Sequence, residues 1–341
     1  MQSETVGPPE RAVTIYDVAK VAGVSPSTVS RAFSRPGRVS ARTAQHVRQV
    51  AADLGYRSEE IFPPPTPTRT QLIGMAVSDI TNPFYFPIIR GGERAAAEAG
   101  FSLVLTDADE SDRIERESLK RALPVVDGMV IASTRLSDTD LRSIGRNVPV
   151  VVLNRPVPGL NSVIPDTDRA VRRAVEHLAS LGHRKVCYVA GPEASWVDGA
   201  RWRALREASL ELGLDLRDQR IGPVPPTVPG GGKASTEVIA KRATAVLCYN
   251  DMIAIGVMRG LRARGVAVPG QVSVVGFDNT VASTLVTPGL TTVASPLVTL
   301  GEAAMRNVIA LSKGAVPHGK GPTVIPCRLI VRESTGPPPI T

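Results

Sequence analysis

The segment from Thr14 to Arg31 constrains the fold more strongly than any other part of this 341-residue chain. Thr14, followed three positions later by Asp17, predicts the N-cap and acidic first turn of a helix, and apolar residues then recur at helical spacing. Gly23 predicts a left-handed end to this helix, and Ser25 predicts the cap of a second one. Two short helices joined by a tight, glycine-containing turn predict a helix-turn-helix.

The beginning of the second helix is the part of such a motif that meets base edges in the major groove of DNA. Ser27 and Thr28 are small enough to allow close approach, and the forked guanidinium of Arg31 can read guanine N7 and O6. The same capping signals also fit two ordinary helices of a small bundle, which is the alternative interpretation. The residues that we expect at DNA are Thr14, Tyr16, Ser25, Pro26, Ser27, Thr28, Ser30, Arg31 and Arg42.

The charge of the chain is concentrated in the same region. Ser40 predicts the cap of a third helix that ends near Gly55, so residues 13–57 are expected to form a small three-helix domain. Residues 11–58 hold eight basic and two acidic side chains, which accounts for most of the net charge of +8. A basic domain on a nearly neutral remainder indicates a polyanionic partner for that domain, although a solvated basic face is the simpler alternative.

Residues 58–71 are rich in proline and are expected to form the linker, or hinge. Pro63, Pro64, Pro65 and Pro67 cannot sustain a helix and favour an extended polyproline conformation. The composition therefore separates the basic domain from a larger second region, residues 72–335.

From residue 72 onward, short apolar runs alternate with segments of helical periodicity. This alternation predicts an α/β fold with parallel sheets covered on both faces, and two successive series predict two lobes that share a cleft. The predicted strands are 72–77, 101–106, 128–132, 148–153, 185–189, 245–248, 272–277, 323–326 and 328–331. The predicted helices lie near 87–99, 114–123, 137–145, 168–181, 200–212, 234–242, 251–264 and 297–312.

Polar and aromatic residues follow several of the predicted strands, where ligands of open α/β sheets bind. Aromatic planes, amides, carboxylates and arginines that converge from two lobes suit a polar ring such as a sugar. A turn or a helix cap is the alternative role for each of them, and for Asp251 we expect helix N-capping. The candidate ligand-binding residues are Phe84, Asn154, Arg155, Trp196, Arg201, Asn250 and Asp278.

Several phrases of the sequence resemble one known family. The segments 16–19, 22–25 and 27–31 (YDVA, AGVS and STVSR) resemble the DNA-binding domain of the lac repressor/gal repressor family. The segments 79–85, 181–184, 250–256, 272–278 and 290–293 resemble the effector-binding body of the same family, which is itself similar to periplasmic sugar-binding proteins. The resemblance covers nearly all of residues 13–335.

This resemblance implies a helix-turn-helix head and a two-lobed, doubly wound body that resembles periplasmic binding proteins. It implies a transcriptional regulator of the repressor type that binds operator DNA as a homodimer, since one head reads one half-site. A small polar effector between the lobes, with a sugar as the first expectation, would switch operator affinity, and Arg201, Asn250 and Asp278 would hold its hydroxyl groups. The effector itself, the direction of its action, the operator and the target genes stay open.

The linker departs from the family pattern. Relatives carry a short hinge helix here with a leucine that wedges into the minor groove, and by spacing this position falls on Pro65. A family member whose DNA binding or allosteric coupling is weakened at the hinge is therefore one alternative. The tail, residues 334–341, has no leucine heptad, so we expect a dimer and no tail-assembled tetramer.

Other function classes lack their sequence signals. Residues 229–235 fail the phosphate-loop pattern at two positions and are expected to form a flexible surface loop. The four histidines lack metal-binding spacing and no catalytic constellation is present, so we expect no enzyme, no cofactor and no metal. Cys187, Cys248 and Cys327 are expected to be free thiols.

The beginning of the chain has no signal-sequence pattern, and no run approaches membrane-spanning length. We therefore expect a cytoplasmic protein without a membrane partner. The same observation and the basic head argue against the other alternative, a solute-binding protein that serves a transporter.

Overall fold

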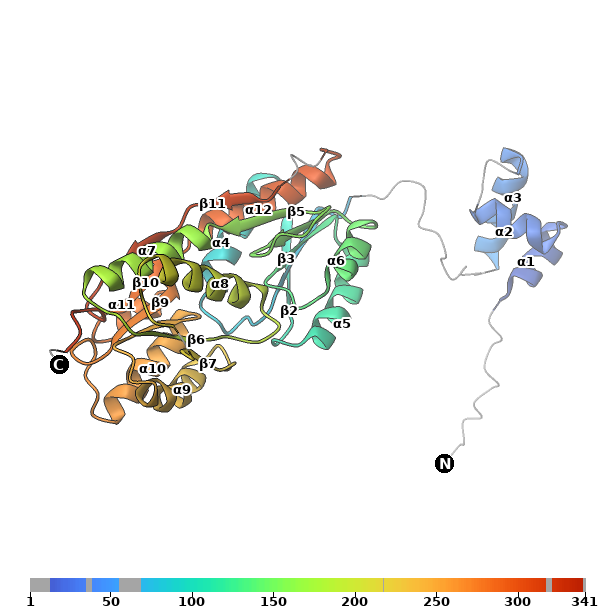
Figure 1. Ribbon diagram of the computed structural model, residues 1–341. Helices are drawn as coiled ribbons and strands as arrows, with labels where there is room; N and C mark the ends of the chain where they lie inside the picture. The colour runs from blue at the N-terminus through green and yellow to red at the C-terminus, as the bar shows by residue number, and fades with distance from the viewer. Residues whose placement is uncertain (1–12, 35–38, 55–68, 217, 317–320, 340–341) are drawn as a thin grey trace, which may run out of the picture. The chain divides into compact units, whose positions relative to one another are not determined.

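The computed structural model describes residues 13–34, 39–54, 69–216, 218–316 and 321–339. The chain divides into two compact units, Met1–Thr68 and Arg69–Thr341, which we call the head and the body and describe separately (Figure 1). The predicted linker, residues 58–71, lies outside the described residues except for residues 69–71.

The head is the predicted bundle of three helices, α1 (Ile15–Ala22), α2 (Pro26–Ser34) and α3 (Ala41–Asp53). The carboxylate of Asp17 accepts hydrogen bonds from the Thr14 amide at 2.8 Å and the Thr14 hydroxyl at 2.6 Å. Gly23 ends α1 with a φ of 65°, and the Ser25 hydroxyl accepts from the amide of Thr28 at 3.2 Å. These local caps set the helix-turn-helix angle. Its small core consists of Val18, Ala19, Ala22, Val29, Ala32, Ala44, Val47 and Ala51.

The body has two lobes, each built on a six-stranded sheet (Figure 1). In the N lobe the order is β11 (Thr323–Ile325), β5 (Asn161–Pro165), β4 (Val150–Leu153), β3 (Gly128–Ala132), β1 (Leu72–Val77) and β2 (Ser102–Asp107), and every neighbouring pair is parallel. In the C lobe the order is β12 (Arg328–Ile330), β10 (Thr291–Ala294), β9 (Ser273–Asp278), β8 (Ala245–Cys248), β6 (Val186–Val189) and β7 (Arg220–Ile221). Only the pairing of β12 with β10 in this sheet is antiparallel.

The two sheets therefore repeat one strand order, with the late strand β11 or β12 added at one edge. In each lobe the order reverses beside the first strand, between β1 and β3 and between β6 and β8. Such a switch point opens a crevice at the carboxyl ends of the strands, which is where doubly wound sheets bind ligands.

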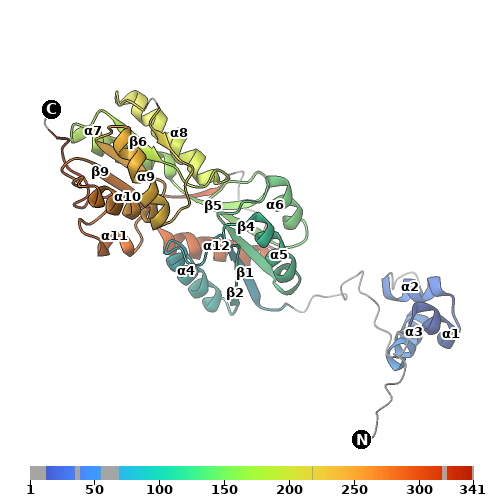
Figure 2. The ribbon, with the colours of Figure 1, turned by 90° about the horizontal axis from the view of Figure 1, so that it is seen from below.

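Helices cover both faces of each sheet, as the two views show (Figures 1 and 2). In the N lobe, α4 (Tyr85–Glu98) and α12 (Leu297–Ser312) pack on one face, and α5 (Asp112–Ala122) and α6 (Asp138–Gly145) on the other, with a short 3-10 turn at Leu123–Val125. In the C lobe, α7 (Thr167–Ser180) and α8 (Trp196–Glu211) pack on one face, and α9 (Val228–Ala240) and α10 (Asp251–Ala263) on the other, near the short α11 (Ala282–Leu285). The predicted doubly wound architecture is confirmed.

The chain passes between the lobes three times within its described part. It enters the C lobe after β5, returns after β10 to place α12 in the N-lobe core, and crosses again between β11 and β12. Periodicity did not predict β5, β7, β10 or α11, which are two to five residues long. The described helices include none that is both long and apolar enough to cross a membrane.

The prediction of a flexible loop at residues 229–235 is wrong, because α9 begins at Val228. Its glycines allow α9 and α10 to pack with their backbones in contact. A Cβ atom on Gly231 would lie 2.1 Å from the carbonyl oxygen of Ile253, and one on Gly256 would lie 2.1 Å from the carbonyl oxygen of Val228. Close helix contact, and not chain flexibility, is therefore the reason for this glycine run.

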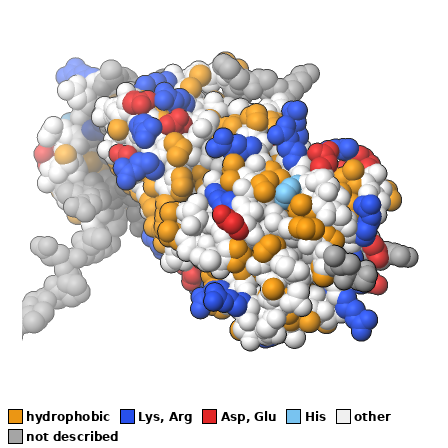
Figure 3. All heavy atoms as spheres, turned by 90° about the vertical axis from the view of Figure 1, so that its left-hand side faces the viewer, with side chains coloured by type: hydrophobic (Ala, Val, Ile, Leu, Met, Phe, Trp, Pro, Cys, Tyr) orange, Lys and Arg blue, Asp and Glu red, His pale blue; other side chains and the backbone are white. Residues whose placement is uncertain are grey.

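The end of the body formed by the C lobe is seen in Figure 3, where Lys and Arg side chains are dispersed among hydrophobic and uncharged ones. This dispersion agrees with the nearly neutral composition of the region after the linker. The surplus of basic residues in the head thus has no counterpart on this face of the body.

Candidate functional site

The head presents one group of polar side chains around the start of α2. Tyr16, Ser25, Pro26, Ser27, Ser30, Arg31 and Arg42 are exposed, and Thr14 and Thr28 are partly buried. Tyr16 is a large aromatic residue that is 70% exposed on a domain with a small core. The arrangement leaves the N-terminal turn of α2 accessible, as insertion into a major groove requires.

Not every arginine of the head is available to phosphate groups. The guanidinium of Arg48, on α3, donates a hydrogen bond to the carbonyl oxygen of Ala32 at 3.3 Å. Arg48 therefore joins α3 to α2 and supports the position of the second helix.

In the body, side chains from both lobes surround one small pocket at the strand ends of the two sheets. The N lobe contributes residues that follow β1, β2, β3 and β4, and the C lobe contributes residues that follow β6, β8, β9 and β10. The cavity is only about 30 Å³, whereas pockets that enclose a small-molecule ligand are typically ~300 Å³ or more. A ligand of sugar size thus requires the lobes to separate or side chains to move. The lining residues are Asn82, Phe84, Tyr85, Glu110, Ser133, Arg135, Asn154, Pro165, Val197, Arg201, Pro226, Tyr249, Asn250, Asp278 and Ser295.

Four of the lining residues have left-handed backbone conformations although none is glycine. The φ angles are 54° at Glu110, 54° at Ser133, 70° at Asn154 and 106° at Asp278. Such conformations cost of order 1–3 kcal/mol each and are found chiefly at functional sites. Asp278 is the last residue of β9, and the other three stand one to three residues after a strand, so the unusual backbone turns these side chains at the edge of the sheet.

The C-lobe side of the pocket is organised by Arg201, which is 4% exposed. Its guanidinium donates to the carboxylate of Asp278 at 3.2 Å and to the carbonyl oxygen of Tyr249, and it lies 3.5 Å from the centre of the Phe277 ring. The Nε atom of Arg201 has no hydrogen-bond partner among the described residues. Burial raises the pKa of Asp278, and the attraction to Arg201 counteracts this rise. A ligand hydroxyl group here would find both a donor and an acceptor.

The capping of α10 falls to Asn250 and not to Asp251. Asn250 is the N-cap of α10, where its side-chain oxygen accepts from the amide of Ile253 at 2.9 Å and its amide group donates to the carbonyl oxygen of Pro226 at 3.3 Å. Asp251 is fully buried and does not cap the helix, so the expectation of N-capping is wrong. Its carboxylate accepts from the hydroxyl of Thr292 at 2.6 Å and from the amide of Thr280 at 2.7 Å.

Asp251 therefore holds the loop after β9 and the strand β10 against the start of α10. Burial raises the pKa of Asp251 to about 6, and these hydrogen bonds oppose the rise. Its carboxylate acts as a structural acceptor behind the pocket.

The N-lobe side contains a second arginine and carboxylate. The guanidinium of Arg135 donates to the carboxylate of Glu110 and, at 3.1 Å, to the carbonyl oxygen of Ser133. The side-chain amide of Asn154 donates to the Ser133 hydroxyl at 2.9 Å, while its oxygen has no partner within the described ranges.

Aromatic rings form the walls beside these polar groups. Phe84 and Tyr85 pack edge to face with ring centres 4.9 Å apart at the start of α4. Tyr249 contributes from the C lobe, with its hydroxyl 3.1 Å from that of Ser195. A Cβ atom on Gly191 would lie 2.5 Å from the Tyr249 ring, so glycine makes room for this ring.

The structure brings together five of the seven candidate ligand-binding residues, namely Phe84, Asn154, Arg201, Asn250 and Asp278. Arg155 does not line the pocket, because its guanidinium pairs with Asp138 and donates to the carbonyl oxygen of Leu136 at 2.9 Å. Trp196 does not line it either and is 38% exposed at the start of α8.

Sequence reasoning missed Glu110, Arg135 and Tyr249. The first two follow β2 and β3, so the rule that searches the residues after each strand would have found them if it had been applied to these two strands. Tyr249 directly follows β8, beside the candidate Asn250.

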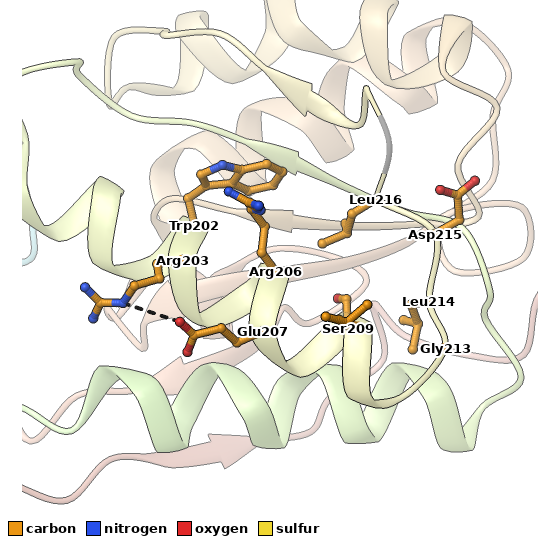
Figure 4. Close-up of a pocket in the computed structure, with 10 residues that line it drawn as sticks. Trp202, Arg203, Arg206, Glu207, Ser209, Gly213, Leu214, Asp215 and Leu216 are labelled. Atoms are coloured by element: carbon orange, nitrogen blue, oxygen red, sulfur yellow. Dashed lines mark ion pairs between the residues drawn. The ribbon is translucent and has the colours of Figure 1, made fainter.

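A larger groove, of about 700 Å³, lies elsewhere on the C lobe, along the end of α8 (Figure 4). Apolar side chains of Trp202, Leu214 and Leu216 line it beside Arg206. The polar groups of the two lobes do not meet there, and its residues come from α8 and the segment that follows it. We therefore take the pocket between the lobes as the candidate ligand site.

Two family models match the chain. Residues 14–59 match bacterial regulatory proteins of the lacI family, and residues 175–335 match a periplasmic binding protein-like domain. The first covers the helix-turn-helix, and the second covers most of the C lobe and the returning segments.

Curated relatives match over almost the whole length. The HTH-type transcriptional regulator DegA of Bacillus subtilis is 31% identical over 333 residues, which are 95% of this chain and 98% of that protein. The HTH-type transcriptional repressor CytR of Escherichia coli is also 31% identical over 333 residues, which are 96% of this chain and 97% of that repressor.

Solved structures match to a similar extent. The lac repressor dimer bound to operator and the anti-inducer ONPF has a TM-score of 0.71 and 28% identity, with 96% of this chain and all of that one covered. The complex of the transcriptional regulator CelR with cellobiose has a TM-score of 0.71 and 29% identity, with coverages of 94% and 99%.

Proposed function

The chain belongs to the lacI family of bacterial regulatory proteins and is a DNA-binding transcriptional regulator, and from this premise we propose how its two units work. The head binds operator DNA, and a small polar effector, of the sugar class, binds between the lobes and switches operator affinity. The observation that carries this proposal is the convergence of polar groups from both lobes on one pocket, with buried donor and acceptor atoms of Arg201 and Asn154 that have no partner in the described part of the chain.

We assign DNA binding to residues 13–57, the hinge to residues 58–71, and effector binding and dimerisation to residues 72–335. The regulator acts in the cytoplasm as a homodimer on a pseudo-palindromic operator, since one helix-turn-helix reads one half-site. The lac repressor dimer bound to its operator and the CelR–cellobiose complex support this assignment as structures of similar proteins.

The proposed switch is a shift between two arrangements of the lobes. An effector can move this equilibrium only as far as its affinity for the two arrangements differs. Contacts made to both Asn154 and Arg201 supply such a difference, because one ligand can reach both side chains only when the lobes are close. The change in the lobes alters how two heads of a dimer fit their half-sites, and so couples effector binding to operator affinity.

In the head, we propose that Arg31 reads guanine in each half-site, while the side chains of Ser25 and Ser27 approach the groove and its phosphates. Replacement of Arg31 by Ala should relax the preference at one base position and cost about 1–3 kcal/mol of specific binding. Equal weakening on all sequences would instead identify Arg31 as a phosphate contact.

The experiment that tests the proposal is selection of bound sequences from a random duplex pool by the full-length protein, with and without a mixture of sugars. We expect an enriched pseudo-palindrome whose recovery changes when the sugars are present. The variant Asp278→Asn, which keeps the size of the side chain but removes its charge, should retain the same enriched sequence and lose the response. Failure to enrich any sequence would refute DNA recognition by this head.

A further inference from the structure

The N-lobe half of the pocket contains an ion pair that the family resemblance did not indicate. Arg135 lies three residues after β3, its side chain is 9% exposed, and its guanidinium donates to the carboxylate of Glu110, whose side chain is 28% exposed. The backbone amide of Arg135 also donates to the carboxylate of Glu115 at 3.1 Å. The arginine is therefore held from two sides while its side chain lines the cavity.

The pocket has a balanced set of charges. Its described lining includes two arginines, Arg135 and Arg201, and two carboxylates, Glu110 and Asp278, and it contains no lysine or histidine. Each guanidinium is paired with one carboxylate, Arg201 with Asp278 at 3.2 Å and Arg135 with Glu110. Each arginine of the lining thus has its own carboxyl partner, and no further charged side chain is found among the described lining residues.

Three polar atoms of the lining remain available for hydrogen bonds to a ligand, and none of them requires a charged ligand group. The side-chain oxygen of Asn154 can only accept, the Nε of Arg201 can only donate, and the hydroxyl of Ser295 can do both. All three atoms are buried without a partner among the residues that the structure describes, in residues that are 4%, 4% and 8% exposed. Buried polar atoms of this kind are costly unless a ligand or water satisfies them. Hydroxyl groups, which both donate and accept, satisfy all three.

We infer that Arg135 and Glu110 act together as effector-binding residues and that the pocket selects an uncharged polyhydroxyl compound, such as an unphosphorylated monosaccharide, over phosphorylated or acidic sugars. This inference rests on the proposed function of the pocket as the effector site. The guanidinium of Arg135 donates to ligand oxygens, and the carboxylate of Glu110 keeps it from attracting an anion.

The selectivity follows from the cost of burying an unpaired charge. A phosphate or carboxylate group that enters between the lobes loses its hydration and meets arginines that are already paired with carboxyl groups. It also approaches the carboxylate of Glu110, which repels it. An uncharged sugar carries no such charge and can bridge donors and acceptors of both lobes.

The test measures ligand binding to the full-length protein at pH 8.5, above the raised pKa of Asp278. The probes are glucose, galactose, ribose and xylose, with glucose 6-phosphate, ribose 5-phosphate and galacturonate as charged counterparts, and the readouts are thermal shift and titration calorimetry. We expect at least one uncharged sugar to bind about tenfold or more tightly than its charged counterpart, a difference of ~1.4 kcal/mol. Tighter binding of a charged counterpart, or no binding of any uncharged probe, would overturn the inference.

Two variants identify the residues responsible. Glu110→Gln leaves Arg135 without its counter-charge, so the preference for the uncharged sugar over its phosphate should fall about tenfold or reverse. Arg135→Gln should weaken binding of the sugar itself by a similar factor. The matched control is Glu117→Gln, on the exposed face of α5, where the carboxylate pairs with Arg113 at 3.0 Å. If Glu110→Gln behaves like this control, Glu110 does not set the selectivity.

These measurements do not use DNA, so they separate the inference from the proposed function. If the protein binds an uncharged sugar as predicted but its operator affinity does not respond to that sugar, the selectivity of the pocket is supported and the proposed switch is wrong. If the operator affinity responds only to charged sugars, the switch is supported and the inference about selectivity is wrong.

Discussion

The close packing of α9 against α10 predicts how much stability the protein loses when a Cβ atom is added between the two helices. In the variant Gly256→Ala, the new Cβ atom would lie 2.1 Å from the carbonyl oxygen of Val228, 2.8 Å from the amide nitrogen of Gly232 and 2.9 Å from the Cα of Gly231. All three are backbone atoms, so no flexible side chain can move aside. Since carbon and oxygen need about 3.4 Å or more, the two helices must separate by about 1 Å.

Overpacking of a core costs ~1–3 kcal/mol, and alanine recovers ~1 kcal/mol of helix propensity relative to glycine. Because three backbone contacts are violated at once, we expect the overpacking cost at the upper end of that range. The free energy of unfolding should then fall by about 2 kcal/mol, and the melting temperature of the body by about 5 °C. The start of α10 carries Asn250, so affinity for the effector should fall as well.

The matched control is Gly232→Ala in the neighbouring helix. Its Cβ atom would meet only the carbonyl oxygen of Gly256, at an ordinary 3.8 Å. This variant should be as stable as the wild type or more stable by up to ~1 kcal/mol. Urea and thermal unfolding followed by circular dichroism compare the two variants. If Gly256→Ala is no less stable than Gly232→Ala, the reasoning about close helix contact is wrong.

Further predictions concern the thiols, the pH dependence and the assembly. Burial raises the pKa of Cys187 to about 12 and of Cys327 to about 11, and the side chain of Cys248 is fully buried. The native protein at pH 8 should therefore resist alkylation by iodoacetamide until it is unfolded. Rapid alkylation of the native protein would contradict this. Burial raises the pKa of Asp278 to about 8, so a sugar that donates to its carboxylate should bind about tenfold more weakly at pH 6.5 than at pH 8.5, and calorimetry that shows the opposite trend would exclude this contact. Light scattering should give twice the chain mass of 36.1 kDa, whereas a stable tetramer would refute the expected dimer.

Local interactions made the head predictable. The contacts that set its helices, from Thr14 to Asp17 and from Ser25 to Thr28, span three residues each. A cap and a left-handed glycine are recognisable in the sequence because both partners lie within one turn. The alternation of strands and helices was predictable for a similar reason, since it depends on periods of two and 3.6 residues.

Part of the pocket was predictable because its residues stand where a predicted strand ends. Asn154, Asn250 and Asp278 stand at or immediately after the ends of β4, β8 and β9, so the rule for doubly wound sheets located them. The pairing of Arg135 with Glu110 joins residues 25 positions apart, and that of Arg201 with Asp278 joins residues 77 positions apart. The sequence around these four residues does not indicate which residue each of them will contact.

The sequence by itself determined that a basic helix-turn-helix precedes a two-lobed α/β body, because helix caps, hydrophobic periods and charge are properties of neighbouring residues. Only the tertiary structure decided that α12 returns to the core of the N lobe, that the glycines of α9 touch α10, and that Asp251 is a buried structural acceptor. These features depend on which distant segments the folded sheets bring together. Such contacts are selected by packing and burial of the whole body, which no short stretch of sequence records.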